Sequence, residues 1–468
     1  MSIFSNSRSI QSIGLILLSI LLVLGMGWVI GSGILDLMGF MVILGAILLG
    51  VFLLGQQGHR NLLLACIAGL ILGWRSLHIL SFRVYIYPSE LLIWVGFAVY
   101  LLDTVHIKKL QPLPRLPRYA KLLAIFTLLG LVVAAMNDKP LESALDQAKS
   151  FFIFVPLIFL FQGWIKSVAD IYLYVRTLVV VGFTIAGFGL LEYFVPVISG
   201  LVANLQHSPT DYEYLRFNYQ SGDWIRLSPF NIWGTPVVAV ALVPVVGLLY
   251  VVFLRVKGVQ KWLWACMGLI IVTGIILSGY RSAWLGLLVM AIVMLFLDRK
   301  SAVVVWLSGI ILILYLPARF ITHFYSILAF VETRDHSILV RFTRLREGLQ
   351  SILHHPLLGS GWSTRAVFND WVYIAVALGL PALIIFIIWY SRLIQKLIGV
   401  FRRSILTFNR LDRILAGGFL LGLTGYAVSM ISGAMSQVRP LMTAFWIFFC
   451  LAWRFVELIG DVEYSQER

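Results

Sequence analysis

Long apolar runs recur along most of this 468-residue chain. A run of about 20 apolar residues can cross a bilayer as a helix, and lipid admits only helices or closed barrels as spanning structures. The strands of a barrel would be short and would alternate apolar with polar residues. The runs here are long and continuous, so the sequence predicts an all-α fold, a polytopic transmembrane helical bundle.

The apolar runs predict about fourteen spans. We place them at 12–30, 34–55, 61–79, 89–104, 119–136, 150–164, 169–195, 233–254, 262–279, 283–298, 302–317, 371–390, 413–433 and 440–458. Basic residues concentrate in "HIKKLQPLPRLPRYAK", "LRVKGVQK", "LDRKS" and "YSRLIQKLIGVFRRSILTFNRLDR", which fall on the same side as Arg8. An excess of Lys and Arg marks the cytoplasmic side. Both termini are therefore expected in the cytoplasm, and residues 1–468 form a single integral membrane domain.

Two longer segments then lie on the exterior, at 196–232 and 318–370. The second exterior loop is expected to be partly helical, because apolar residues recur in it at helical spacing. This stripe comprises Ile338, Phe342, Leu345, Leu349 and Ile352, with Arg341 beside it. Such an amphipathic helix can lie on the membrane surface or cover a cavity.

Charge and cysteine usage exclude several classes of protein. The net charge of +15 could indicate nucleic acid, but most basic residues lie between spans, so no nucleic-acid partner is expected. The three cysteines fall in apolar runs and form no disulfide framework or metal-ligand pattern. The sequence contains neither a P-loop nor a Gly-rich dinucleotide-binding turn. We expect no cofactor and no metal.

One arginine, Arg281, stands between two apolar runs in "ILSGYRSAWLGLLV". A charged side chain at membrane depth is expensive, so this position calls for an explanation. The guanidinium can snorkel to the lipid headgroups, or its planar fork can pair with a phosphate or pyrophosphate. Gly279 and the following "SAWLG" indicate a tightly packed helix entry, which favours the anion-binding interpretation.

Polar residues near a later span are candidates for proton transfer. Asp370 follows Asn369 at the opening of the span, where it could be a helix N-cap or a carboxylate that takes a proton from a hydroxyl group. His354 and His355 precede a Pro/Gly turn. Histidine can act as a general base, although a structural role is the alternative for both.

Together these stretches resemble the O-antigen ligase/polymerase superfamily of bacterial membrane proteins. "SGYRSAWLGLLV" is similar to its Ser-Arg-small-small-aromatic-Leu-Gly signature, and "VRFTRLREGLQSILHHPLLGSGW" to its Arg-rich amphipathic helix followed by Pro-Leu-x-Gly-x-Gly. "FNDWVYIAVALGLPALIIF" is similar to its His-Asn-x-x-Leu span entry, and "IRLSPFNIWGTPVVAVAL" to its Arg-containing segment before an earlier span. The resemblance covers roughly 225–390.

The resemblance implies a metal-independent, inverting glycosyltransferase in the bacterial inner (plasma) membrane. Family members transfer a glycan from undecaprenyl pyrophosphate to an acceptor on the outer face. Carried over by position, Arg226 and Arg281 would hold the pyrophosphate, and Arg341 would assist from the covering helix. The implied partners are a polyprenyl-pyrophosphate-linked oligosaccharide and membrane lipid, with other polysaccharide export or chain-length proteins as further candidates.

One departure from the family pattern bears on the reaction. Ligases carry a proposed histidine base where this chain has Phe368. The difference favours a polymerase of exopolysaccharide or O-antigen over a ligase, and it leaves Asp370, His355 or neither as the base. A ligase acting on a lipid or protein acceptor, and a non-enzymatic transporter of polysaccharide or small anions, are the alternatives.

Overall fold

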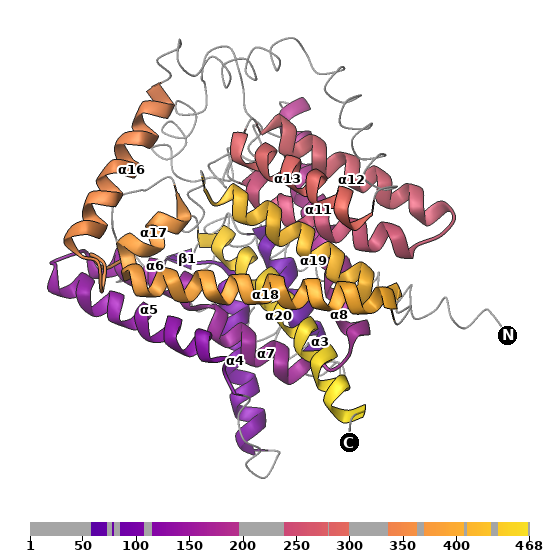
Figure 1. Ribbon diagram of the computed structural model, residues 1–468, viewed down its shortest axis with the longest axis horizontal. Coiled ribbons are helices and arrows are strands. Elements are labelled where there is room, and N and C mark those ends of the chain that lie inside the picture. The colour runs from indigo at the N-terminus through magenta and orange to yellow at the C-terminus, as the bar shows by residue number, and fades with distance from the viewer. Residues whose placement is uncertain are drawn as a thin grey trace.

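The structure is a computed structural model that describes residues 58–72, 77–78, 85–106, 115–195, 238–278, 280–298, 336–362, 369–406, 410–431 and 439–466. Its regular elements are helices apart from one antiparallel pair of two-residue strands, β1 (Leu77–His78) and β2 (Tyr85–Ile86). Figure 1 shows the helices α3 (Gly58–Ala68), η2 (Gly69–Leu72), α4 (Pro88–His106), α5 (Arg118–Met136), α6 (Leu141–Phe152), α7 (Phe154–Trp164), α8 (Val168–Phe194), α11 (Val238–Arg255), α12 (Val259–Leu277), α13 (Arg281–Leu297), α16 (His336–His354), α17 (Asp370–Leu378), α18 (Leu380–Leu406), α19 (Arg410–Ser429) and α20 (Arg439–Gln466).

Within the described residues, seven helical segments are long and apolar enough to cross a membrane. They are Arg118–Met136, Leu141–Trp164, Val168–Leu191, Val259–Leu277, Leu380–Ile405, Arg410–Ser429 and Leu441–Gly460, beside four shorter apolar helices. The expected all-helical membrane fold is thus confirmed. The spans expected at 12–30, 34–55 and 302–317 lie outside the described residues, and the full span count and the cytoplasmic termini stay predictions.

The expected spans at 61–79 and 371–390 are among those whose boundaries differ in the structure. The helix expected at 61–79 ends at Leu72, and a strand occupies Leu77–His78. The span expected at 371–390 is divided at Gly379 into α17 and α18, and α18 continues to Leu406. Much of the basic segment expected between spans is therefore helical.

The division at Gly379 has a local cause. Its φ is +88°, a left-handed conformation that favours glycine. A Cβ atom at this position would lie 2.5 Å from the carbonyl carbon of Leu357. Gly379 thus both ends α17 and lets the 356–361 turn approach the backbone.

Helix α19 packs against α11, α13 and α18 at the centre of the bundle (Figure 1). Glycines allow the close approach: a Cβ on Gly286 of α13 would lie 2.7 Å from the carbonyl oxygen of Gly425, and one on Gly247 of α11 would lie 2.6 Å from the nitrogen of Gly422. Small residues at such crossings let helix backbones come together in a membrane. The ends of α11 and α13 are consequently placed by α19.

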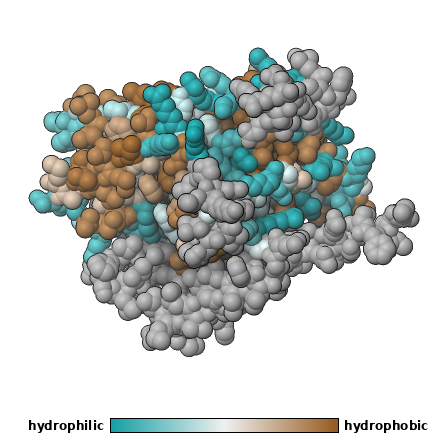
Figure 2. All heavy atoms as spheres, turned by 90° about the horizontal axis from the view of Figure 1, so that it is seen from below, coloured by the Kyte–Doolittle hydropathy of each residue, from teal (hydrophilic) through white to brown (hydrophobic). Residues whose placement is uncertain are grey.

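The outer surface fits a lipid environment. Helix α5 leaves Ile125, Leu128, Val132 and Met136 more than half exposed. Figure 2 shows a wide apolar area on the face seen from below, the side on which α5 lies in Figure 1. Apolar side chains can remain exposed in this way when lipid, not water, surrounds them.

Candidate functional site

The end of α19 brings together the starts of two helices that are far apart in the sequence. Ser429 donates its hydroxyl to the carbonyl oxygen of Ser282 at 3.1 Å, one residue after Arg281. The next residue, Met430, accepts a hydrogen bond from the backbone N–H of Asp370 at 3.0 Å. Arg281 opens α13 and Asp370 opens α17, so both candidates lie at helix starts joined to Ser429, the last residue of α19, and to Met430, which follows it.

Arg281 is held by a compact turn between α12 and α13. Ser278 donates its hydroxyl to the Ile275 carbonyl at 2.6 Å, and its oxygen accepts the N–H of Tyr280 at 3.2 Å. Trp284 donates its indole N–H to the same Ile275 carbonyl at 3.2 Å. Arg281 is half-buried at the first position of α13. A guanidinium beside the positive end of a helix forms an environment suited to an anion.

Asp370 is completely buried, and its neighbour performs the capping role. The Asn369 side chain accepts the N–H of Val372 at 3.0 Å, which makes Asn369 the N-cap of α17. The capping interpretation considered for Asp370 is therefore wrong. Asp370 occupies the first turn with an exposed fraction of 0%, and a carboxylate in that turn is stabilised by the helix dipole.

Arg341 lies on the buried stripe of α16. Leu345, Gly348 and Ile352 follow Arg341 at spacings of four, three and four residues, and Gly348 and Ile352 are buried. Helix α16 contacts α17, and in Figure 1 it runs across the end of the bundle where α17 lies. The expected helix is confirmed, but its expected apolar stripe is not the buried face, because Phe342 and Leu349 have exposed fractions of 55% and 49%. Its sequence position places Arg341 on the inward side of that helix.

His355 lies at the other end of α17 from Asp370. The carbonyl of the next residue, Pro356, accepts the N–H of Leu380 at 2.8 Å, just beyond the end of α17. Ser360 in the same turn donates its N–H to the Val376 carbonyl at 2.7 Å. A nine-residue helix is about 13 Å long. His355 is also exposed, so the structure does not bring the two candidate bases together.

Arg226 and Phe368 lie outside the described residues. Their expected roles stay predictions. Within the part of the chain that the structure describes, no group of three or more His, Cys, Asp or Glu side chains could hold a metal ion.

A buried ionic cluster was not expected from the sequence. Lys149 of α6 lies 3.1 Å from a carboxylate oxygen of Glu90 and 3.1 Å from one of Asp146. Ser150 donates its hydroxyl to Glu90 at 2.7 Å. Both carboxylate residues have exposed fractions of 1%. We call Glu90, Asp146 and Lys149 the acidic triad, since two carboxylates share one ammonium.

The acidic triad adjoins a contact with α17. Gln147 stands between Asp146 and Lys149 in the sequence of α6. Its side-chain oxygen accepts a hydrogen bond from the phenol of Tyr373. Tyr373 follows Asp370 by one helical turn. The available sequence signal was the i,i+3 pair Asp146 and Lys149, which stands just before an apolar run.

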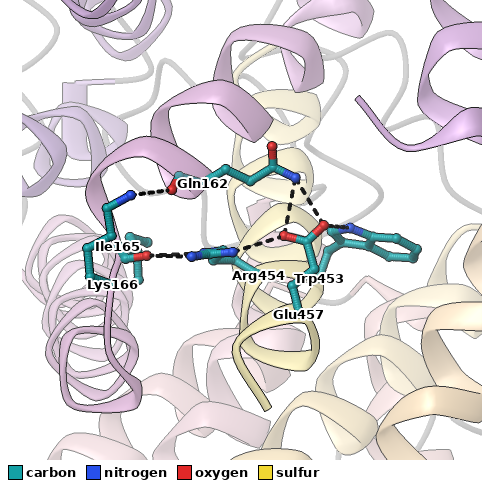
Figure 3. Close-up of polar contacts among 6 residues, drawn as sticks. All are labelled: Gln162, Ile165, Lys166, Trp453, Arg454 and Glu457. Carbon is teal, nitrogen blue, oxygen red and sulfur yellow. Dashed lines mark hydrogen bonds and ion pairs between the residues drawn. The ribbon is translucent and has the colours of Figure 1, made fainter. Parts of the chain in front are cut away.

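A second polar cluster joins α7 to α20 (Figure 3). Glu457 accepts hydrogen bonds from Gln162 at 3.0 Å, from Trp453 at 2.6 Å and from Arg454 at 3.3 Å. Arg454 also donates to the Ile165 carbonyl at 3.1 and 3.0 Å, at the end of α7. These contacts satisfy a helix terminus and pair the charges with each other. The cluster is a structural connection between helices.

Comparison with known families identifies the segment that contains these helices. The family model described as O-antigen ligase (Wzy_C) matches residues 266–387. This segment is therefore similar to O-antigen ligases, and we refer to residues 266–387 as the O-antigen ligase domain. No curated protein matches the chain.

The O-antigen ligase domain contains Arg281, Arg341, His355 and Asp370, and it lies inside the expected resemblance at 225–390. Arg226 precedes the matched residues. The domain covers most of α12, all of α13, α16 and α17, and the first residues of α18. The expected family is thereby confirmed for the part of the chain that holds most of the candidate site.

Proposed function

We propose that this protein is a polysaccharide polymerase of the bacterial inner membrane. It transfers a glycan from an undecaprenyl-pyrophosphate carrier to a sugar hydroxyl of an acceptor on the outer face. The observation that carries the proposal is that Arg281 and Asp370, both in the matched segment 266–387, begin helices that are joined to Ser429 and Met430. A cation for the leaving group and a carboxylate for the proton are the two groups that such a transfer uses.

In the proposed reaction the acceptor oxygen attacks the anomeric carbon of the donor sugar from the face opposite the carrier. The bond between that carbon and the pyrophosphate oxygen breaks, so the configuration inverts. The hydroxyl proton passes to the Asp370 carboxylate. Negative charge collects on the departing pyrophosphate, where Arg281, Arg341 and Arg226 stabilise it through paired N–H donors.

The position of Asp370 supports it as the base in preference to His355. Asp370 begins α17 at the end of α19 that also binds the start of α13, where Arg281 lies, whereas His355 lies beside the opposite end of α17. A base must lie within hydrogen-bond reach of the proton that it removes. One acceptor hydroxyl cannot reach both residues at once.

A ligase is the second candidate, because the matched family is described as O-antigen ligase. The histidine base proposed for ligases has Phe368 at the corresponding position, which favours the polymerase. Carbohydrate export or chain-length proteins would act beside either enzyme.

Reconstitution of the purified protein in liposomes tests these functions against each other. Lipid-linked repeat units are supplied alone or together with a lipid A-core acceptor. Growth of the lipid-linked chain without lipid A-core supports the polymerase, whereas transfer only to lipid A-core supports the ligase. Movement of the substrate across the bilayer without a new glycosidic bond would indicate a transporter.

A further inference from the structure

Helix α17 depends on its neighbours for its orientation. It has nine residues, and Gly379 separates it from α18. Helices shorter than about 12 residues are marginal in isolation. The direction in which α17 presents Asp370 is therefore set by contacts with the surrounding helices.

Polar contacts hold the first turn of α17 from two sides. On the α19 side, Asp370 donates its backbone N–H to Met430, and Trp371 donates its indole N–H to the Ala427 carbonyl at 3.2 Å. On the α6 side, the Tyr373 phenol donates to Gln147. Asp370 and Tyr373 are three residues apart, so they are neighbours on the helix surface. A change at Tyr373 is consequently transmitted to Asp370 over a single turn.

The Tyr373 ring packs against aromatic neighbours, and its hydroxyl group makes a polar contact with α6. The ring of Trp362 lies 6.3 Å from that of Tyr373, and the Trp362 indole N–H is bound to the Thr127 carbonyl at 3.0 Å. Tyr373 itself is fully buried. Phenylalanine at position 373 would preserve this packing and remove the hydroxyl group that donates to Gln147.

The acidic triad fixes the side of α6 that carries Gln147. Lys149 bridges Asp146 on its own helix and Glu90 on α4, and Ser150 binds the same glutamate. Buried charges persist only where they are paired and hydrogen-bonded, and losing one partner is strongly destabilising. Rotation of α6 would separate Lys149 and Ser150 from Glu90 on α4, so Gln147 is held in place toward Tyr373.

We propose that Gln147 and Tyr373 are positioning residues that orient the Asp370 carboxylate toward the acceptor hydroxyl, with the acidic triad as the fixed support of Gln147. This inference rests on the proposed function, in which Asp370 receives the proton. Gln147 and Tyr373 act through Asp370 and the orientation of α17.

The test is a double-mutant cycle of Tyr373→Phe, Gln147→Ala and the double variant, with kcat, KM and thermal unfolding measured in detergent. Chain growth is assayed on lipid-linked repeat units at equal amounts of folded protein. Tyr250→Phe is the matched control, since it removes a partly buried phenol hydroxyl that contacts Asp298 at 3.5 Å, beyond the end of α13.

Tyr373→Phe is expected to lower kcat by on the order of 10-fold or more with KM nearly unchanged, because small misplacements of a catalytic group slow reactions steeply. The double variant should be no slower than the slower single variant, and Tyr250→Phe should keep the wild-type kcat. A structural role alone would lower the unfolding temperature without lowering kcat per folded molecule, and that result would overturn the proposal.

Asp370→Asn, assayed beside these variants, separates the two proposals. Wild-type kcat in Tyr373→Phe together with an inactive Asp370→Asn would overturn the positioning role and leave the proposed base in place. Full activity of Asp370→Asn would overturn the proposed base and the positioning role together. Additive losses in the double variant would contradict a shared route through the Gln147–Tyr373 hydrogen bond.

Discussion

The backbone N–H of Asp370 donates a hydrogen bond to the carbonyl oxygen of Met430 at 3.0 Å, where α17 begins and α19 ends. The preceding residue of α19, Ser429, binds the carbonyl that follows Arg281. Two helix starts are thus tied to one helix end. Because packed helices transmit small shifts to one another, the spacing between the arginine and the carboxylate is determined by α19.

Arg281→Lys should leave the protein folded and inserted but remove most of its chain-growth activity. Lysine keeps the charge, and the two residues have similar insertion energies, but its ammonium lacks the planar fork that pairs with pyrophosphate. The measurement is polymer length against time on lipid-linked repeat units. Arg344→Lys is the control, because Arg344 is partly exposed and pairs with Glu347 at 2.9 Å. A wild-type rate for Arg281→Lys would identify Arg281 as a snorkelling residue.

Asp370→Asn should fold normally and polymerise at least about 100-fold more slowly, the typical effect of losing a general base. Asn369 already caps α17, so the substitution removes the carboxylate without removing the cap. His355→Ala is expected to retain activity, since His355 is exposed at the opposite end of the helix. Loss of activity in His355→Ala beside full activity in Asp370→Asn would reverse the assignment of the base.

Hydropathy was sufficient to predict that a helix begins near Arg281, but it did not predict the break between helices at Gly379. The apolar run is interrupted at Arg281, and the start of α13 coincides with that interruption. The run "VYIAVALGLPALIIF" contains no charged residue, so by hydropathy it predicts one continuous span. The break depends on the approach of Leu357 to Gly379, a tertiary contact that periodicity does not encode.

The acidic triad was missed for a related reason. A span chosen by hydropathy begins after Lys149, which leaves Asp146 and Lys149 outside it, whereas the membrane-length helical segment starts at Leu141. The third member, Glu90, belongs to another helix. Local sequence contains no information that pairs Glu90 on α4 with Lys149 on α6, so this ion pair could be found only from the three-dimensional structure.

The charges of the acidic triad should be interdependent in stability. Lys149→Met alone is expected to destabilise the protein by about 3–5 kcal/mol, since it leaves two buried carboxylates without their cation. The neutral triple variant Glu90→Gln, Asp146→Asn and Lys149→Met should regain most of that loss. Thermal unfolding in detergent is the measurement. A single variant as stable as the wild type, or a triple variant less stable than Lys149→Met, would contradict the pairing.

Gly379→Ala should be among the most destabilising small substitutions in the O-antigen ligase domain. Gly379 has a φ of +88°, and a Cβ there would lie 2.5 Å from the Leu357 carbonyl carbon and 2.8 Å from the Leu358 nitrogen. Backbone strain at positive φ contributes about 1–3 kcal/mol, and the collision with backbone atoms adds to it. The 356–361 turn must then move away from α17, which lowers chain growth as well as the unfolding temperature.

Alanine substitutions at two other glycines distinguish the effect of backbone strain from that of a steric clash. Gly258 has a φ of +62° with nothing within 4 Å of an added Cβ, so Gly258→Ala tests strain alone. Gly187 lies within α8 and also has open space around an added Cβ, and alanine there should be neutral or stabilising because it is the better helix former. We expect the unfolding temperature to fall in the order Gly187→Ala, Gly258→Ala, Gly379→Ala. If Gly258→Ala and Gly379→Ala were equally stable, the contact between the 356–361 turn and the end of α17 would contribute nothing to holding that helix.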